Sequence, residues 1–173
     1  QTAFHFSITN SDWEDNVRFE ELVKNCKEVG YFEAGGKKWT CPFHPVSINK
    51  QECESLKGSL SISSCNYNND YWAGAAKQCG GTNKMPTLAD LANIASVLYS
   101  GNPVIGPTKD VDGLTYVPDT ASSLGLPEPS FLIWAADNNT QYNASSRGFY
   151  SSYTKYIYSS RNGSGMWGIC AVN

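Results

Sequence analysis

The side chains best suited to recognising another molecule gather in the last 43 residues, from 131 to 173. This stretch reads FLIWAADNNTQYNASSRGFYSSYTKYIYSSRNGSGMWGICAVN and carries only four charges. Tyrosine offers a large, rigid contact area, and serine, glycine and asparagine offer adaptable hydrogen bonds, as in antibody binding loops. Composition alone also fits a polar low-complexity loop or a solvated sheet face. The interleaved Trp134, Phe149 and Ile157 favour an ordered structure, because disordered segments lack such residues.

Six cysteines form the second group of reactive side chains. None of them lies in a CxxC pair, and the two histidines, His5 and His44, are not near such a pair, so the pattern disfavours zinc. An even number of dispersed cysteines favours a disulfide framework formed in an oxidising compartment. We therefore expect an extracellular or cell-surface protein.

Two successive segments share one plan, in which a helical cysteine is followed by glycine and then by a strand that ends at a second cysteine. This repetition predicts the disulfides Cys26–Cys41 and Cys53–Cys65. The remaining pair, Cys79–Cys170, would tie the middle of the chain to its C-terminal strand. Six cysteines allow many pairings, and the repeated plan is what selects this one.

Composition and charge limit the class of protein. A chain of 173 residues with 40% hydrophobic residues suits one domain, or one domain with a small subdomain. The net charge of −3 and a pI near 5.3 provide no basic field that would attract nucleic acid. The longest apolar runs are too short to cross a membrane. The sequence begins abruptly at Gln1, and we expect a leader or anchoring segment to have preceded it.

The first half of the sequence predicts several short elements. Residues 3–8 alternate between apolar and polar side chains, as in a strand, with His5 as an edge residue. A helix is predicted to begin at Ser11 and to end at Gly30. A Gly-Gly turn and a strand over 37–40 lead to Cys41. A further helix carries Cys53, is broken at Gly58, and is followed by an alternating strand before Cys65.

The second half contains the clearest helix. Residues 70–79 predict a short helix that Gly80 and Gly81 end. Thr87 then caps a helix with Asp90 in the capping-box position. The apolar face of that helix is expected to be core, and it comprises Leu88, Leu91, Ala92, Ala95, Leu98 and Tyr99. Residues 101–130 predict a long irregular connection with one helical turn over 119–124, and strands are expected over 131–134 and 166–172.

The segment from Gly80 to Leu91 resembles a known family. Its Lys84-Met85-Pro86-Thr87 stands where the formylglycine-generating-enzyme branch of the C-type lectin fold has Arg-Leu-Pro-Thr at a helix start. Ile133-Trp134-Ala135 and 168–172 are similar to the family's later strands. The resemblance implies an α+β fold, with a C-type-lectin-like domain over 70–173 and a small disulfide-stapled subdomain over 1–69. Lysine at 84 and the long loop 101–130 depart from the family pattern.

The Tyr/Asn/Ser-rich stretch resembles the variable region of proteins diversified by retroelements, which rewrite codons that match template adenines. The resemblance implies that Trp134, Gln141, Lys155, Met166 and Trp167 are fixed scaffold residues, because such rewriting does not produce these types. The residues implied to contact a ligand, all of permitted types or beside them, are Ala135, Asp137, Asn138, Asn139, Tyr142, Asn143, Ser145, Tyr150, Ser151, Tyr153, Tyr156, Tyr158, Ser160 and Asn162.

The whole chain also resembles the head part of type IV pilin-like surface proteins of gut bacteria, although it lacks their first apolar helix. These resemblances imply a binding protein whose diversified face, about 135–164, takes a protein or glycan ligand on another cell or host surface. A pilus or membrane anchor through a missing N-terminal segment is also implied. The alternatives are a structural or adhesive pilus subunit and a fixed glycan-binding lectin without diversification.

Catalysis and metal binding are disfavoured by the residues themselves. Both histidines lie within the first 44 residues, so neither is near a nucleophile in the later part of the sequence. Calcium prefers several carboxylates, and Asp110 and Asp112 are better explained by a turn before Gly113. We therefore expect no enzyme activity, no cofactor and no metal site. Three glycosylation sequons begin at 138, 143 and 162, and such matches arise by chance in an Asn/Ser-rich stretch.

Overall fold

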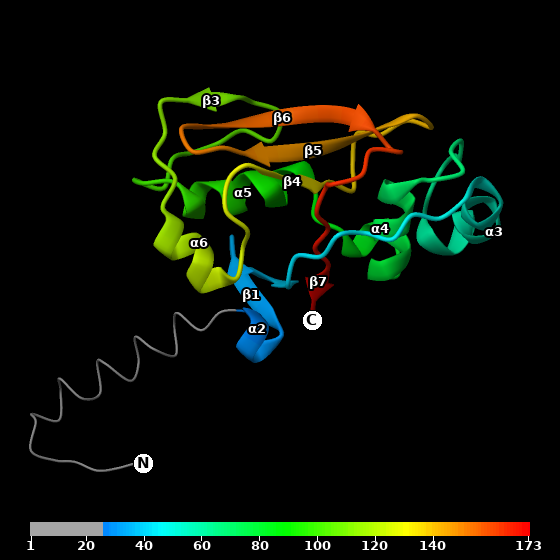
Figure 1. Cartoon of the computed structure of the whole chain (residues 1–173), viewed down its shortest axis with the longest axis horizontal. Helices are drawn as coiled ribbons and strands as arrows, with labels where there is room; N and C mark the ends of the chain where they lie inside the picture. Colours follow the sequence, from blue (N-terminus) through cyan, green and yellow to red (C-terminus); the bar gives the residue numbers. More distant parts are fainter. Residues whose placement is uncertain (1–25) are drawn as a thin grey trace, which may run out of the picture.

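The computed structural model describes residues 26–173 (Figure 1). The predicted strand over 3–8, with His5, and the predicted helix start at Ser11 lie outside the described residues. The last turn before Gly30 is described as helix α2 (Cys26–Val29). Gly30 has a φ of +87°, a left-handed conformation that glycine adopts without strain. The predicted end of this helix at Gly30 is therefore confirmed.

Two antiparallel sheets form the β part of the fold. The first has the order β1-β2-β7, with β1 at Tyr31–Ala34, β2 at Lys37–Thr40 and β7 at Ala171–Val172. The second has the order β3-β6-β5-β4, with β3 at Val111–Asp112, β4 at Phe131–Trp134, β5 at Asn143–Phe149 and β6 at Tyr153–Ser160. Because β2 pairs with β7, the first sheet joins an early strand to the C-terminal one.

The helices fill the space around these sheets, so the fold is mixed α+β. They are α3 (Lys50–Leu60), α4 (Tyr71–Cys79), the short 3₁₀ helix η1 (Thr82–Lys84), α5 (Leu88–Leu98) and α6 (Pro118–Leu124). Thr87 and Asp90 form the predicted capping box at the start of α5. Gly80 ends α4 in a left-handed conformation, as predicted. The Asp70 side chain caps the start of α4, which was not predicted.

The four-stranded sheet separates two hydrophobic clusters. On one face, Phe131, Ile133 and Phe149 pack with the buried face of α5. On the other face, Trp134 and Ala144 join a second cluster that includes residues of α3 and α4. Figure 1 shows α5 alongside this sheet, with α3 and α4 grouped near the end where β4 passes into β5. Both faces of β4 and β5 are therefore tied to the core, and the hairpin has a rigid base.

The three disulfides join the cysteines as predicted, Cys26 to Cys41, Cys53 to Cys65 and Cys79 to Cys170. The third links the end of α4 to the segment that leads into β7, across a sequence separation of 91. A disulfide adds roughly 2–4 kcal/mol to stability, and the chain-entropy account assigns the most to the longest loop.

Three predicted elements differ from the structure. Helix α3 continues through Gly58 to Leu60, because Ser61 in a left-handed conformation caps the helix and the side chains of Cys53 and Leu60 are buried. No strand is present between α3 and Cys65. The predicted strand over 166–172 is instead a segment that changes partners, since Trp167 bridges Ile133 and the last residues pair with β2.

The long connection over 101–130 is more ordered than predicted. The expected helical turn is present as α6, which Gly125 ends in a left-handed conformation. The connection also contributes β3, whose two residues pair with the start of β6. A two-residue strand leaves no periodic signal in the sequence, because alternation needs four or more residues to be visible.

Candidate ligand-binding surface

The Tyr/Asn/Ser-rich stretch folds into the β5–β6 hairpin and the loop that leads into it. The register pairs Asn143 with Ser160 at one end and Phe149 with Thr154 at the other. The loop over 135–142 precedes the first end, and the turn over 150–152 closes the second. At a rise of about 3.3 Å per residue, the seven-residue β5 separates these two ends by roughly 20 Å.

Alternation along β6 places its side chains on opposite faces of the sheet. Tyr156, Tyr158 and Ser160 share one face, and Tyr153, Lys155 and Ile157 share the other. The predicted contact residues therefore do not form one face. They divide between the two ends of the hairpin. Asn138, Tyr142, Tyr156, Tyr158 and Ser160, joined by Tyr67, which was not predicted, define a loop-end surface. Tyr150, Ser151 and Tyr153, joined by Lys155, which was expected to be scaffold, define a turn-end cluster.

Hydrogen bonds and ring contacts connect the loop-end surface. The Asn138 amide nitrogen donates to the Tyr156 hydroxyl at 2.6 Å. The Ser160 hydroxyl donates to the Tyr67 hydroxyl at 3.0 Å, and the Tyr67 ring meets the Tyr142 ring edge-on at 6.2 Å between centroids. These two groups of contacts bring residues of β6, of the preceding loop and of the segment before α4 together at the loop end. Tyr67 lies outside the stretch that sequence reasoning selected.

A buried ion pair holds the loop end in place. Arg161, which is 1% exposed, pairs with the fully buried Asp70 through Nη2 and Oδ2 at 2.7 Å. The guanidinium also donates from Nη1 to the Thr140 carbonyl oxygen at 2.8 Å and lies over the Trp72 ring. Asp70 accepts the Ala73 amide at the start of α4 through its other oxygen. One charge pair therefore joins the loop before β5, the end of β6 and α4.

Several predicted contact residues instead support the loop. Asp137 accepts the Leu88 amide at 2.8 Å and thereby caps the start of α5, where the helix dipole favours a negative charge. Ser145 is fully buried and donates to the Asn138 carbonyl oxygen at 2.6 Å. Ala135 is also fully buried, and its carbonyl oxygen accepts the Trp72 indole. Ala135 and Ser145 do not present side chains at the surface, because the core closes over them.

The structure gives each predicted contact residue a place. Exposed side chains are those of Asp137, Asn138, Tyr142, Ser151, Tyr158 and Asn162. Half-buried side chains are those of Asn139, Asn143, Tyr150, Tyr153, Tyr156 and Ser160. Tyr142 and Tyr158 are the most exposed of the tyrosines among them, at 46% and 45%. Both belong to the loop end.

The turn-end cluster is a compact aromatic stack on the other face. Tyr150 stacks on Tyr153 with 4.5 Å between ring centroids, and the Lys155 ammonium lies over the Tyr153 ring at 5.2 Å. The Tyr150 ring covers Gly148, where an added Cβ would meet it at 2.7 Å. Burial, followed by the nearby Tyr153, raises the pKa of Tyr150.

Tyr99, at the end of α5, holds the turn over 150–152 in place through hydrogen bonds. Its hydroxyl shares its proton between the carbonyl oxygens of Tyr150, at 2.8 Å, and Tyr153, at 3.0 Å, and accepts the Tyr150 amide. Burial is the main reason that the pKa of Tyr99 is raised to about 12, and the hydrogen bond with Tyr150 opposes that shift. Tyr99 thus stays neutral and keeps the turn closed over the normal pH range.

A second buried arginine, Arg147 on β5, holds the long connection against the sheet. Its Nη2 donates to the carbonyl oxygens of Gly106, Pro107 and Lys109, at 3.1, 3.1 and 2.9 Å. Burial lowers the pKa of Arg147, an effect opposed by the nearby Asp110. This role of Arg147 was not predicted from the sequence. Its rarity as a cation in a stretch with only four charges was a signal that could have indicated a structural role.

Within residues 26–173, no group of three or more histidine, cysteine or acidic side chains is arranged to hold a metal ion. No helix in this range is long and apolar enough to span a bilayer. Comparisons of the chain with protein-family models, with curated proteins and with solved structures found no match.

Proposed function

We propose that this chain is an extracellular binding protein that recognises a protein or glycan on another cell or host through its loop-end surface. The observation that carries the proposal is the exposure of Tyr142 and Tyr158, which are nearly half exposed, above a buried framework. That framework includes Arg161, Asp70 and Trp72, all at most 1% exposed. Large aromatic side chains on a rigid base cost little conformational entropy when they bind.

The chemistry of the loop-end surface favours a neutral, hydrogen-bonding ligand. None of its six members carries a charge, and its hydroxyl and amide groups both donate and accept hydrogen bonds. Tyrosine is enriched among the residues that dominate binding energy at interfaces. Stacking on a tyrosine ring and hydrogen bonds from amides suit a glycan ring or a polar protein surface equally, so both ligands belong to the proposal.

Diversification of this surface and a C-type-lectin-like fold over 70–173 form the finer part of the proposal. Support comes from the order of elements, because the Thr87-capped α5 precedes the Trp134 strand and the chain closes through Cys170. Further support comes from the separation of roles, since buried residues hold the hairpin while Tyr142 and Tyr158 point outward. A surface can vary when the fold depends on other residues.

The three disulfides suit the oxidising compartment that the proposal requires. The proposal extends to display of this surface on the head of a pilin-like surface protein. The disulfide-stapled segment over 1–69 would then act as the accessory part of that head.

A binding experiment tests the proposal directly. The purified chain would be applied to a glycan panel and to whole cells from its source community, beside the variant Tyr142→Ser/Tyr158→Ser. Removing two central aromatic anchors costs at least about 2 kcal/mol, which corresponds to roughly 30-fold weaker binding. The matched control is Tyr150→Ser/Tyr153→Ser, with the same chemistry at the turn end, and it should bind like the parent. Equal loss in both variants, or loss only in the control, would reject the loop-end surface.

Diversification has its own test. Deep sequencing of the gene's 3′ end across the source population should show substitutions concentrated at exposed positions such as Asn138, Tyr142 and Tyr158. Arg147 and Arg161 should stay constant, because their buried guanidinium groups hold the hairpin. A uniform sequence would remove diversification and leave a fixed binding surface to be tested as above.

A further inference from the structure

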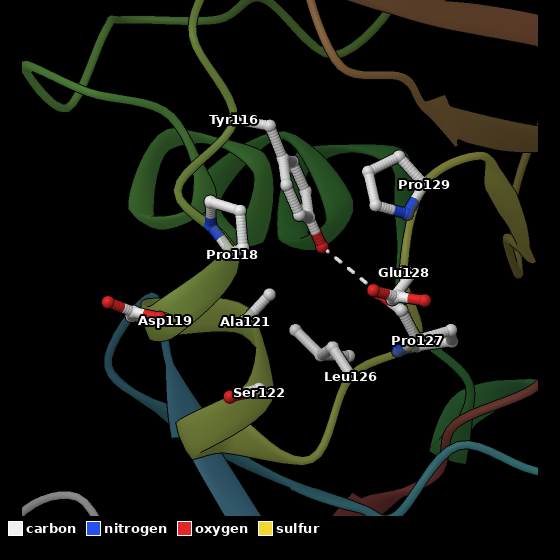
Figure 2. Close-up of a pocket in the computed structure, with 9 residues that line it drawn as sticks. All are labelled: Tyr116, Pro118, Asp119, Ala121, Ser122, Leu126, Pro127, Glu128 and Pro129. Carbon is white, nitrogen blue, oxygen red and sulfur yellow. Dashed lines mark hydrogen bonds between the residues drawn. The ribbon is translucent and has the colours of Figure 1, made fainter.

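A cleft of about 300 Å³ lies between α6 and the segment over 126–129, and none of its lining residues belongs to the β5–β6 hairpin. Figure 2 shows the Tyr116 ring standing between Pro118 and Pro129, with Ala121 and Leu126 below it. The proposed function uses none of these residues. The cleft is therefore a second candidate site with its own chemistry.

The walls of the cleft are largely apolar and held in a fixed arrangement. Tyr116 meets Tyr99 and Phe131 edge-on, with ring centroids at 5.5 and 6.5 Å. Its hydroxyl donates to the Pro127 carbonyl oxygen at 3.2 Å, which ties the ring to the opposite wall. Proline side chains have little conformational freedom to lose. A ligand would enter a preformed space, which lowers the entropy cost of binding.

The charged side chains that line the cleft are both acidic. Glu128 lies beside the hydroxyl end of the Tyr116 ring, and Asp119 lies on α6 at the other side of the opening (Figure 2). Among the described residues, neither carboxylate forms an ion pair, and no lysine, arginine or histidine lines the cleft. Burial, followed by the nearby Tyr99 and Glu128, raises the pKa of Tyr116.

We propose that this cleft binds an alkylammonium group, with its methylene stem against Tyr116 and the prolines and its ammonium at Glu128. The chemistry matches a lysine side chain, which buries its stem on apolar surface and keeps its charged end at a polar rim. A cleft of about 300 Å³ is at the small end of ligand sites, so it suits one such side chain or a small free amine. Asp119 adds a second negative charge at the opening.

The whole chain, labelled with nitrogen-15, would be titrated with N-acetyl-lysine methylamide and followed by amide chemical shifts. Saturable shifts confined to residues 116–129, with a dissociation constant in the millimolar range, are expected for one small cation. N-acetyl-norleucine methylamide has the same stem without the charge and should cause no saturable shift. Absence of shifts over 116–129 with the lysine compound, or equal binding of the norleucine compound, would overturn the proposal.

Charge-removing variants make the test specific to the cleft. Glu128→Gln and Asp119→Asn should each weaken binding by about threefold, and the double variant by about tenfold, as expected for partly exposed ion pairs. Asp112→Asn removes an equal charge from exposed β3 and should bind like the parent. Unchanged affinity in the double variant, with unchanged melting temperature, would also overturn the proposal.

A third arm identifies the source of the ammonium group. The titration would be repeated with n-butylammonium and with a short peptide that carries one central lysine. Equal affinity for both would support a site for free amines, and tighter binding of the peptide would support a site for a lysine on a protein partner. Failure of both would count against the cleft as a cation site and would leave the loop-end surface unaffected, because that surface lies on other elements.

Discussion

At the loop end of the β5–β6 hairpin, Tyr142 and Tyr158 stand nearly half exposed, and a buried ion pair below them fixes the backbone. At the turn end, Tyr150 and Tyr153 stack on each other, and Tyr99 fixes the backbone through neutral hydrogen bonds. Tyrosine rings are thus exposed to solvent at one end of the hairpin and packed against each other at the other end. Tyrosine content alone therefore does not define a binding surface, because a ligand can contact only the solvent-exposed area of the rings.

The two ends also differ in the charges that support them. Arg161 faces the carboxylate of Asp70, whereas Arg147, farther along the hairpin, donates mainly to backbone carbonyl oxygens. A buried charge pair is costly to break, because removal of one partner leaves the other charged and unpaired. We therefore expect the stability of the loop end to fall more on loss of Arg161 than the stability of the turn end falls on loss of any one residue.

The largest effect is expected from Arg161→Met, which leaves the buried Asp70 without its partner. The free energy of unfolding should fall by about 3–5 kcal/mol, measured by urea denaturation. Amide hydrogen exchange should rise at the loop over 135–142 more than at the turn over 150–152. Lys155→Met removes an exposed cation from β6, the strand that ends just before Arg161. It should change stability by less than about 1 kcal/mol, because only the contact with the Tyr153 ring is lost. A similar result for both variants would contradict the proposed support of the loop end.

Alkaline pH should act at the turn end through Tyr99, in addition to its effect on Tyr116 in the cleft, whose pKa is also raised. The pKa of Tyr99 is about 12 in the folded chain and about 10 when unfolded, so the folded state holds its proton more tightly. Stability from this group is complete below pH 10 and is lost as pH rises through 12, a decrease of about 2–3 kcal/mol. Tyr99→Phe should flatten this part of the pH profile, and Tyr158→Phe should retain it. An unchanged profile in Tyr99→Phe would show that other groups control it.

A smaller effect is expected when the link between the loop end and α5 is removed. Asp137→Ala deletes the carboxylate that accepts the Leu88 amide, and loss of a helix cap costs about 1 kcal/mol. Thermal unfolding followed by circular dichroism would measure the change. Gln141→Ala alters an exposed side chain of the same loop and is the matched control. Equal melting temperatures for Asp137→Ala and the parent would assign Asp137 to the surface rather than to the framework.

An effect of similar size is expected from Gly148→Ala at the turn end. The added Cβ would lie 2.7 Å from the Tyr150 ring and 3.0 Å from Ile157, so the ring must move off the strand. Loss of one aromatic stack costs about 0.5–1.5 kcal/mol. Ring-current shifts of Tyr150 and Tyr153 in proton NMR spectra should diminish, while those of Tyr142 stay constant. Ser151→Ala, at the exposed turn, should leave all of these shifts unchanged.

Local signals in the sequence predicted much of the frame. The Thr87 and Asp90 pair predicted the start of α5, Gly80 predicted the end of α4, and FLIW predicted the bounds of β4. These predictions were confirmed because caps and short buried strands depend on neighbours in sequence. Gly58 shows the limit of such signals, since the roughly 1 kcal/mol helix cost of glycine is outweighed by the burial of Cys53 and Leu60.

The candidate site was predicted less completely, for a physical reason that lies in the hairpin. A shift of one residue in register moves every side chain to the opposite face of a sheet. The stretch over 143–160 is rich in serine and tyrosine on both faces, so it has no apolar alternation that would reveal which tyrosines share a face. The single face predicted for 135–164 was therefore two surfaces, and Tyr67 joined one of them through a contact across 93 positions.

By itself, the sequence determined the residue types available for binding, the disulfide framework and the capped helices, since each follows from composition or from spacing along the chain. Only the tertiary structure decided which tyrosines are free. That outcome depends on contacts between distant segments, such as Arg161 with Asp70 and Tyr99 with the turn. Such contacts leave no local pattern, because they exist only when the segments have been brought together.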